Sequence, residues 1–216
     1  MMIELKNYTH IIWDWNGTLL NDAWLCVDVM NGMLEARGLP LKTVEEYKEL
    51  FDFPVRDYYV KLGFDFEREP FDEVGMEFIL RYNMRQGETV LHRQVKDVLS
   101  QFEAQGFLQY ILSAREQNEL ISETKSLGVF NYFKQIRGLD DHYAHGKMDV
   151  ALQLVKEMDI DRREMLYFGD TRHDAEVADQ IGIDCILITH GHHSRERLKP
   201  LGVPLLSSLK DLILLL

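Results

Sequence analysis

The stretch HIIWDWNGTLLND (His10–Asp22) places a carboxylate and an amide directly after an apolar run. The apolar run favours a buried strand of a parallel sheet, and that strand ends at Asp14. Asn16 follows two residues later, and Gly17 allows a sharp turn that points backbone N–H groups at a ligand. Ligands of open parallel sheets bind at the carboxyl ends of the strands. The stretch therefore predicts one wall of a binding site.

Further apolar runs indicate more strands of the same sheet. With the first, the expected strands are Ile11–Asp14, Leu108–Ser113, Lys134–Gly138, Met165–Gly169 and Cys185–Thr189. Between the later runs, residues 116–128 and 147–158 carry apolar side chains at helical spacing. Alternating strands and helices predict an α/β protein with a doubly wound, Rossmann-like parallel sheet.

The interval between the first and second strands is too long for a single crossover helix. Helical patterns fill it at Asp22–Arg37, Val44–Leu50, Val55–Leu62 and Glu67–Met84. We expect residues 20–88 to form an inserted helical cap domain and residues 1–19 and 89–216 to form the α/β core. A crossover helix over His92–Gln105, ended by Gly106, should return the chain to the sheet.

The composition of the chain excludes several kinds of partner. The 216 residues are 46% apolar and carry a formal net charge of -12, and no basic stripe offsets that charge. We therefore expect no binding to nucleic acid. No window approaches the ~20 apolar residues that a membrane helix requires, and Cys26 and Cys185 lack metal-binding spacing. These features predict a cytoplasmic protein without membrane contact. The sequence does not distinguish a monomer from a homodimer.

Residues able to take part in chemistry follow the ends of the other strands. Ser113 and Ala114 follow the second strand, Lys147 opens the helix after the third, and Asp170 and Asp174 follow the fourth. Each has an ordinary structural explanation by itself, as a helix cap, an acidic first turn or a solvated surface residue. Their joint appearance at successive strand ends indicates a shared site instead.

This ordered set resembles the haloacid dehalogenase superfamily. The motifs of that superfamily are an Asp-x-Asp-x-Thr strand end, a Ser or Thr after the second strand, a Lys, and Gly-Asp-x-x-x-Asp. The matching positions here are Asp14, Gly17, Thr18, Ser113, Lys147, Gly169, Asp170 and Asp174. The resemblance covers nearly the whole chain, because the helical insert also looks like that superfamily's cap. It implies an Mg²⁺-dependent phosphomonoester hydrolase of phosphoglycolate-phosphatase-like type that acts on a small phosphorylated metabolite.

The resemblance also implies a role for each residue. Asp14 would be the nucleophile that forms an aspartyl-phosphate, and Lys147 would offset negative charge on it. Phosphate oxygens would be bound by groups of Gly17, Thr18, Ser113 and Ala114. Mg²⁺, which prefers oxygen ligands, would be bound by Asp14, Asp170, Asp174 and the backbone carbonyl of Asn16.

Asn16 departs from this pattern, because phosphatases of the superfamily carry an acid/base aspartate at its position. Asparagine can hydrogen-bond the leaving oxygen but cannot transfer a proton, and loss of a general acid/base typically slows a reaction ~10²- to 10⁴-fold. Another group can replace it, with His142, His145, His173 or a cap residue as candidates. Alternatively, the chain is a catalytically impaired relative that binds phosphate, or Asn16 is a replacement made to trap a substrate.

Branches of the superfamily that cleave C–P or C–halogen bonds also lack the second aspartate. Asp-Trp-x-Gly-Thr resembles the phosphonoacetaldehyde hydrolase version, which relies on a cap lysine that forms an imine. The cap lysines here are Lys42, Lys48 and Lys61, and none lies in a recognisable sequence context. A phosphonatase- or dehalogenase-like hydrolase is therefore an alternative prediction.

Two further segments carry polar residues of interest. Arg56 lies close to the helix start at Pro54, and a surface position is the favoured prediction for it, with binding of an anionic group of the substrate as the alternative. The segment THGHHS (Thr189–Ser194) contains histidines without the i, i+4 spacing of a helical metal site. We expect this segment to be a polar loop near the rim of the active site.

Overall fold

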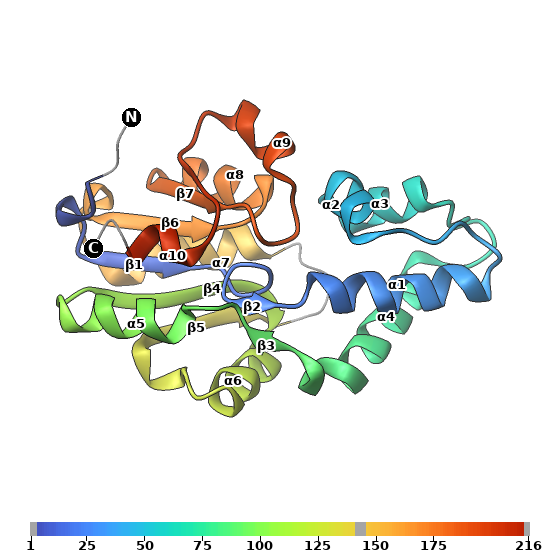
Figure 1. The fold of residues 1–216 in the computed structure, drawn as a ribbon, viewed down its shortest axis with the longest axis horizontal. Coiled ribbons are helices and arrows are strands. Elements are labelled where there is room, and N and C mark those ends of the chain that lie inside the picture. Colours follow the sequence, from blue (N-terminus) through green and yellow to red (C-terminus); the bar gives the residue numbers. More distant parts are fainter. Residues whose placement is uncertain (1–3, 141–145, 214–216) are drawn as a thin grey trace.

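The computed structural model describes residues 4–140 and 146–213. At its centre lies a six-stranded sheet whose neighbouring strands are parallel (Figure 1). Its strands, in spatial order, are β5 (Phe133–Leu139), β4 (Leu108–Glu116), β1 (His10–Trp13), β6 (Met165–Gly169), β7 (Asp184–Ile188) and β8 (Leu205–Leu206). The order runs outward from β1 in both directions, which is the doubly wound arrangement. The predicted α/β fold class is confirmed.

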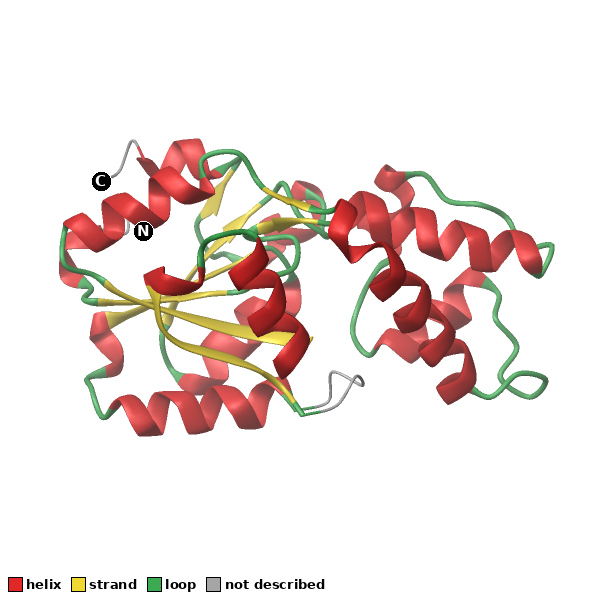
Figure 2. Ribbon diagram, turned by 90° about the horizontal axis from the view of Figure 1, so that it is seen from below, coloured by secondary structure: helices red, strands yellow, loops and turns green. Residues whose placement is uncertain are grey.

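Helices cover both faces of the sheet (Figure 2). One face packs against α5 (Val95–Ala104), α6 (Gln117–Ser126) and α10 (Leu209–Ile213). The other packs against α7 (Lys147–Met158), α8 (Arg172–Ile181) and α9 (Arg195–Leu198). Side chains alternate along β1, so Ile11 and Trp13 face the first layer while Ile12 faces the second. A strand buried on both faces reads as a continuous apolar run, which is why the sequence reveals it.

Short 3-10 helices complete the connections. They are η1 (Leu5–Asn7), η2 (Gln86–Glu88), η3 (Phe130–Tyr132), η4 (Arg162–Glu164) and η5 (Lys199–Leu201). Within residues 4–140 and 146–213, no helix has the length and apolar character needed to cross a membrane.

The chain between β1 and β4 forms a separate group of helices, which we call the helical insert. It contains α1 (Ala23–Ala36), α2 (Val44–Leu50), α3 (Val55–Leu62) and α4 (Phe71–Arg85), which pack around their own apolar core. The insert lies beyond the carboxyl ends of the strands (Figures 1 and 2). Helix α4 begins at Phe71 and not at Glu67, because Pro70 restricts the residue before it to extended conformations.

A two-stranded antiparallel ribbon joins the helical insert to the sheet. Strand β2 (Leu20–Asn21) leads into α1, and β3 (Val90–Leu91) leads out of η2. Leu20 pairs with Leu91 and Asn21 pairs with Val90, so the two connections of the insert lie side by side. Strands of two residues are too short to show a periodic pattern, and the sequence does not predict them.

The ribbon also shortens the crossover helix that follows it. The backbone N–H of His92 donates to the Leu19 carbonyl at 2.9 Å, which holds His92 in the linker. Gln94 then adopts a positive φ of 67°, and α5 begins at Val95. The helix predicted from His92 therefore begins later because the linker forms hydrogen bonds of its own.

Candidate active site

Asp14 follows β1 directly and has a buried carboxylate. Its backbone N–H donates to the Phe168 carbonyl at 2.8 Å, which continues the pairing of β1 with β6 and fixes the residue at the strand end. Lys147 begins α7, and its buried ammonium donates to Oδ1 of Asp14 at 2.6 Å and to Oδ1 of Asp174 at 2.7 Å. The structure thus brings together three residues that are far apart in the sequence.

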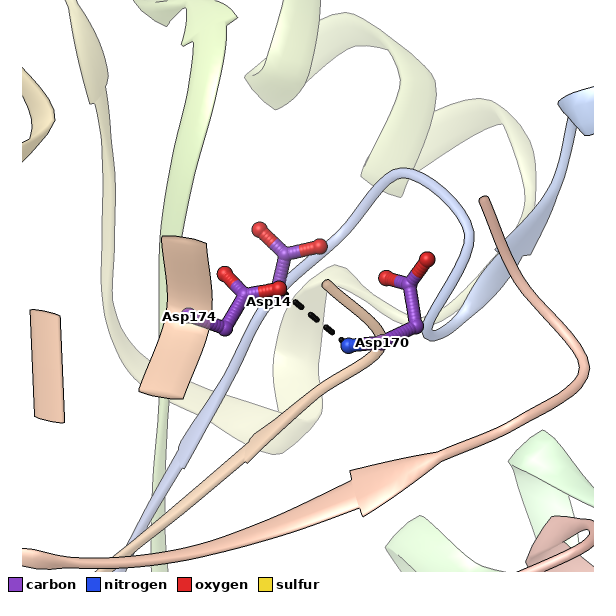
Figure 3. A group of neighbouring side chains, drawn as sticks. All are labelled: Asp14, Asp170 and Asp174. Atoms are coloured by element: carbon purple, nitrogen blue, oxygen red, sulfur yellow. Dashed lines mark hydrogen bonds between the residues drawn. The ribbon is translucent and has the colours of Figure 1, made fainter. Parts of the chain in front are cut away.

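Asp14, Asp170 and Asp174 form one buried acidic group (Figure 3). One carboxylate oxygen from each lies within 4.8 Å of the others. Burial, reinforced by the neighbouring carboxylates, raises the pKa of Asp14 well above its usual range although Lys147 opposes the shift. Burial also raises the pKa of Asp170 to about 6. Negative charge in this group is therefore costly without further positive charge.

Asp174 is held at the start of α8 by donors on both of its oxygens. Oδ2 accepts from the Thr171 backbone N–H at 2.9 Å and from the Thr171 hydroxyl at 2.7 Å, and Oδ1 accepts from Lys147 and from the Tyr167 hydroxyl. Burial opposes ionisation of Asp174, but Lys147 and Thr171 outweigh it and lower the pKa of this carboxyl. Asp174 is consequently a charged residue that orients Lys147.

Two glycines allow the backbone to approach Asp170. A Cβ atom on Gly17, which has a φ of +78°, would lie 2.4 Å from Oδ2 of Asp170, and one on Gly191 would lie 2.1 Å away. The Thr18 hydroxyl donates to Oδ1 of Asp170 at 2.7 Å, and the His192 backbone N–H donates to Oδ2 at 2.6 Å. Thr18 is fully buried, so its hydroxyl holds the Asp170 carboxylate in place and does not face the cavity.

A cavity of about 230 Å³ opens between the sheet and the helical insert. The part of the wall that belongs to the sheet and its loops includes Asp14, Asn16, Ser113, Ala114, Arg115, Lys147, Thr171, Asp174 and His192. The insert contributes mainly apolar side chains, among them Met30, Phe51, Phe53, Val55, Tyr58, Tyr59, Phe71, Phe78 and Ile79. Gly17 and Thr18 are not among the described residues that line it. The cavity is therefore polar on the side of the sheet, which we call the polar floor, and mainly apolar on the side of the helical insert.

Ser113 and Ala114 lie inside β4, which continues to Glu116 beyond its predicted end. Oγ of Ser113 accepts from the Arg115 backbone N–H at 3.1 Å. The Arg115 guanidinium joins α6 to the insert, because it contacts Glu123 at 2.9 Å and donates to Oδ1 of Asn83 at 2.9 Å. Arg115 also lines the cavity, and the sequence gives no signal for this role because its partners come from two different layers.

The Asn16 amide lies against a carboxylate that the motif does not include. Its Nδ2 donates to Oδ2 of Asp22 at 2.8 Å. Asp22 is buried, and it also accepts from the Gly17 backbone N–H and from the Tyr82 hydroxyl, each at 2.9 Å. Burial opposes ionisation, but His192 and these hydrogen bonds outweigh it and lower the pKa of Asp22 to about 2. A carboxylate thus stands beside position 16 although residue 16 has none.

The segment THGHHS is a loop beside the cavity, as expected, and His192 is one of the lining residues. It is not the polar rim that was expected, however, because His192 and His193 are buried. The Nε2 atom of His192 lies 3.3 Å from Oδ1 of Asp22, and its Nδ1 lies 2.8 Å from the Tyr47 hydroxyl. Burial disfavours its charged form, but Asp22 outweighs this effect and raises the pKa of His192 to about 9. The prediction of a polar rim was wrong because an ion pair between His192 and Asp22, which the sequence does not reveal, permits the ring to be buried.

Other candidate residues lie away from the cavity wall. Arg56 is exposed, and its guanidinium lies 5.1 Å from the Phe66 ring centroid. Lys48 donates to the His190 carbonyl at 3.1 Å, and the described lining residues do not include Lys42, Lys48 or Lys61. The His173 ring lies tilted against the Phe53 ring, with 4.8 Å between centroids, and His173 is not among the described lining residues. The two other candidate bases, His142 and His145, lie outside the described residues.

Comparison with known proteins identifies the family. The profile of the haloacid dehalogenase-like hydrolases matches residues 11–188, which include the strand ends and the helical insert. The chain belongs to this family. The resemblance to this family that the sequence motifs indicated is thereby confirmed.

Phosphoglycolate phosphatases are among the similar curated proteins. The one from Yersinia pseudotuberculosis is 32% identical over 107 residues, which are 49% of this chain and 46% of the relative. The chain thus spans about half the length of that relative in the alignment. The one from Pectobacterium atrosepticum is 25% identical over 205 residues, which are 92% of this chain and 87% of the relative.

Solved structures of the family share the fold. A haloacid dehalogenase-like family hydrolase from Streptococcus pneumoniae has a TM-score of 0.83 at 18% identity and covers 97% of this chain and 98% of its own. CbbY from Rhodobacter sphaeroides, solved in complex with phosphate, has a TM-score of 0.72 at 18% identity, with 95% and 96% covered. At these identities the likeness establishes architecture alone.

Proposed function

We propose that this haloacid dehalogenase-like hydrolase cleaves phosphate monoesters of small metabolites in an Mg²⁺-dependent reaction. The observation that carries the proposal is the Asp14 carboxylate, which lies at the carboxyl end of β1, lines the cavity and is bonded to the Lys147 ammonium. Family membership and the similarity to phosphoglycolate phosphatases support it. In this proposal residues 20–88 act as a cap, since the insert supplies one side of the cavity.

In the proposed reaction an oxygen of Asp14 attacks phosphorus, and the bond between phosphorus and the alcohol oxygen breaks. The electron pair of that bond remains on the leaving oxygen, which then takes up a proton. Water hydrolyses the aspartyl-phosphate, which releases inorganic phosphate and restores the carboxylate. Lys147 offsets negative charge at Asp14, and Ser113 and Ala114 are placed in the wall to bind phosphate oxygens.

The acidic group suits a hard cation. Asp14, Asp170 and Asp174 contribute buried carboxylates, and the Lys147 ammonium alone does not balance their charge. Asp14, Asp170 and the backbone carbonyl of Asn16 would hold Mg²⁺, and Asp174 would support them through Lys147. When bound, the ion neutralises charge on the phosphate oxygens.

The proposal is tested by measuring phosphate release from a panel of phosphate monoesters with and without Mg²⁺. We expect release that requires Mg²⁺ and that Asp14→Asn abolishes. Asp97→Asn, which removes an exposed carboxylate on α5, is the matched control and should retain full activity. Equal release by Asp14→Asn and the parent would exclude Asp14 as the nucleophile.

A phosphate-binding protein without turnover is the second candidate. The observation in its favour is the hydrogen bond from the Asn16 amide to Asp22, in which an aspartate at position 16 could not act as the donor when ionised. Calorimetry separates the two candidates, because this role requires Mg²⁺-dependent binding of an ester that is recovered unchanged. Any release of phosphate by the parent that Asp14→Asn lacks would exclude it.

A further inference from the structure

The helical insert gives the cavity an aromatic wall. Its rings belong to Tyr47, Phe51, Phe53, Tyr58, Tyr59, Phe71, Phe78 and Tyr82. Tyr58 meets Tyr47 and Phe51 edge to face, with ring centroids 6.0 and 5.4 Å apart. Rings held in this way are a rigid apolar surface, which favours a flat apolar group over the polar chain of a sugar or a short acid.

Cations along the cavity are already paired. Lys147 is bonded to Asp14, Arg115 to Glu123 and His192 to Asp22. The described lining residues therefore offer no unpaired cation to a second anionic group of a substrate. A carboxylate on the leaving group would lose its hydration without gaining a partner, which disfavours it.

One polar atom of the aromatic wall is unsatisfied. Tyr58 is 2% exposed, and its hydroxyl has no hydrogen-bond partner among the described residues. A buried hydroxyl normally has a partner, and a ligand that fills the cavity would supply it. The hydroxyl itself has almost no accessible surface, so a ligand reaches it only when the Tyr58 ring turns toward the cavity that it lines. The partner would then belong to the part of the ligand remote from the phosphate.

Among the described residues, Asn16 and its neighbour His192 offer no free proton to the leaving oxygen. Asn16 is not an acid, and both ring nitrogens of His192 are engaged, by the Tyr47 hydroxyl and by Asp22. A leaving group that departs as an anion, or that takes its proton from water, needs no acid at this position. A phenolic oxygen, with a pKa of ~10, departs far more readily than an aliphatic alcohol, whose pKa is near the ~15.7 of water.

These observations converge on one class of substrate. We propose that the cavity takes the monophosphate ester of a small phenol that carries one uncharged hydrogen-bonding group facing Tyr58. A cavity of about 230 Å³ suits a single substituted ring, since one of about 150 Å³ holds benzene. The inference rests on the proposed function: Asp14 takes the phosphoryl group, the P–O bond breaks, and its electron pair leaves on the phenolate, which is protonated in water.

The first test compares kcat/KM for phenyl phosphate, benzyl phosphate and phosphoglycolate in Mg²⁺. We expect phenyl phosphate to exceed phosphoglycolate at least tenfold. Benzyl phosphate, with a ring but an aliphatic leaving oxygen, should show a similar KM and a kcat lower by tenfold or more. A kcat/KM for phosphoglycolate equal to or above that of phenyl phosphate overturns the inference and leaves the proposed hydrolase intact. No release from any ester overturns both.

The second test addresses the Tyr58 hydroxyl. Tyr58→Phe keeps the ring and removes the hydroxyl, so KM for 4-hydroxyphenyl phosphate should rise about tenfold while KM for phenyl phosphate stays unchanged. Tyr8→Phe is the matched control, because the Tyr8 hydroxyl donates to Asp184 at 2.7 Å outside the cavity. It should change neither KM. Equal KM values for 4-hydroxyphenyl phosphate in Tyr58→Phe and the parent would overturn the assignment of a hydrogen bond from Tyr58.

Discussion

The half-buried Asn16 amide donates to the buried Asp22 carboxylate at 2.8 Å. Asp22 is already the acceptor for the backbone N–H of Gly17 and for the Tyr82 hydroxyl. The neutral Asn16 amide is a further hydrogen-bond donor to the same carboxylate. The asparagine therefore belongs to a network that crosses from the β1 loop to α1 and α4.

The first prediction concerns this pair. Asn16→Asp places a second carboxylate against Asp22, and we expect the free energy of unfolding to fall by about 1–3 kcal/mol, because a buried acceptor loses its donor and gains a like charge. Urea denaturation without Mg²⁺ measures the change. The double variant Asn16→Asp/Asp22→Asn should not recover the loss, since Asp22 also pairs with His192 and accepts from the Tyr82 hydroxyl. Parent-like stability of Asn16→Asp alone would contradict the network.

The second prediction concerns the cation. Mg²⁺ should raise the melting temperature, because a ligand bound only by the folded state stabilises it, by about 2.7 kcal/mol at a hundred times its Kd. Asp170→Asn should abolish the shift, whereas Asp97→Asn should keep it. The shifts are compared and not the absolute temperatures, since removing one buried charge also changes the metal-free protein. A parent-sized shift in Asp170→Asn would place the ion elsewhere.

The third prediction concerns the ammonium between the carboxylates. Lys147→Met leaves Asp14 and Asp174 without their shared partner, and breaking a buried ion pair in this way costs about 3–5 kcal/mol of unfolding free energy. Lys199→Met is the matched control, because Lys199 is 60% exposed and should tolerate the change. Equal unfolding midpoints for the two variants would show that Lys147 contributes nothing to folding.

The fourth prediction concerns pH. Burial, with the charge of Arg197, lowers the pKa of His193 to about 3, below the ~6.5 of an unfolded chain. The unfolded chain binds the proton more readily between these values, so stability falls as pH decreases below 6.5. His193→Asn keeps an acceptor for the Arg172 backbone N–H, which His193 Nδ1 binds at 3.1 Å, but does not titrate. The parent should lose about 1–2 kcal/mol more than this variant between pH 6.5 and 5.0.

Urea denaturation at these two pH values measures both slopes. The comparison with the variant cancels the contribution of other titrating groups, such as Asp170, whose raised pKa acts in the opposite direction. Identical slopes for His193→Asn and the parent would mean that the buried ring of His193 is not the neutral group described here.

The strand ends are the part of the molecule that the sequence predicts best. The run Met165–Gly169 is a strand with the predicted bounds, because burial on both faces selects apolar residues without interruption. Asp14 and Asp170 each follow such a run, and parallel strands bring their carboxyl ends to one edge. The proximity of these residues follows from topology once the fold class is known.

The neighbours of Asn16 could not be predicted in the same way. Asp22 precedes a helix and resembles an ordinary N-terminal residue, and His192 lies in a polar, histidine-rich segment. Their contact exists only because the insert places α1 next to the loop after β7. A polar segment becomes buried when a partner from another layer neutralises it, and local pattern carries no information about that partner.

The β2–β3 ribbon has a consequence for how this protein can change over evolution. The helical insert enters and leaves through paired residues, Leu20 with Leu91 and Asn21 with Val90, so its two ends are neighbours in space. An insert attached in this manner can be exchanged for another without rethreading any strand of the sheet. Such an exchange would replace the aromatic wall while Asp14 and Lys147 kept their positions. The choice of substrate could then change while the residues that carry out the reaction stayed the same.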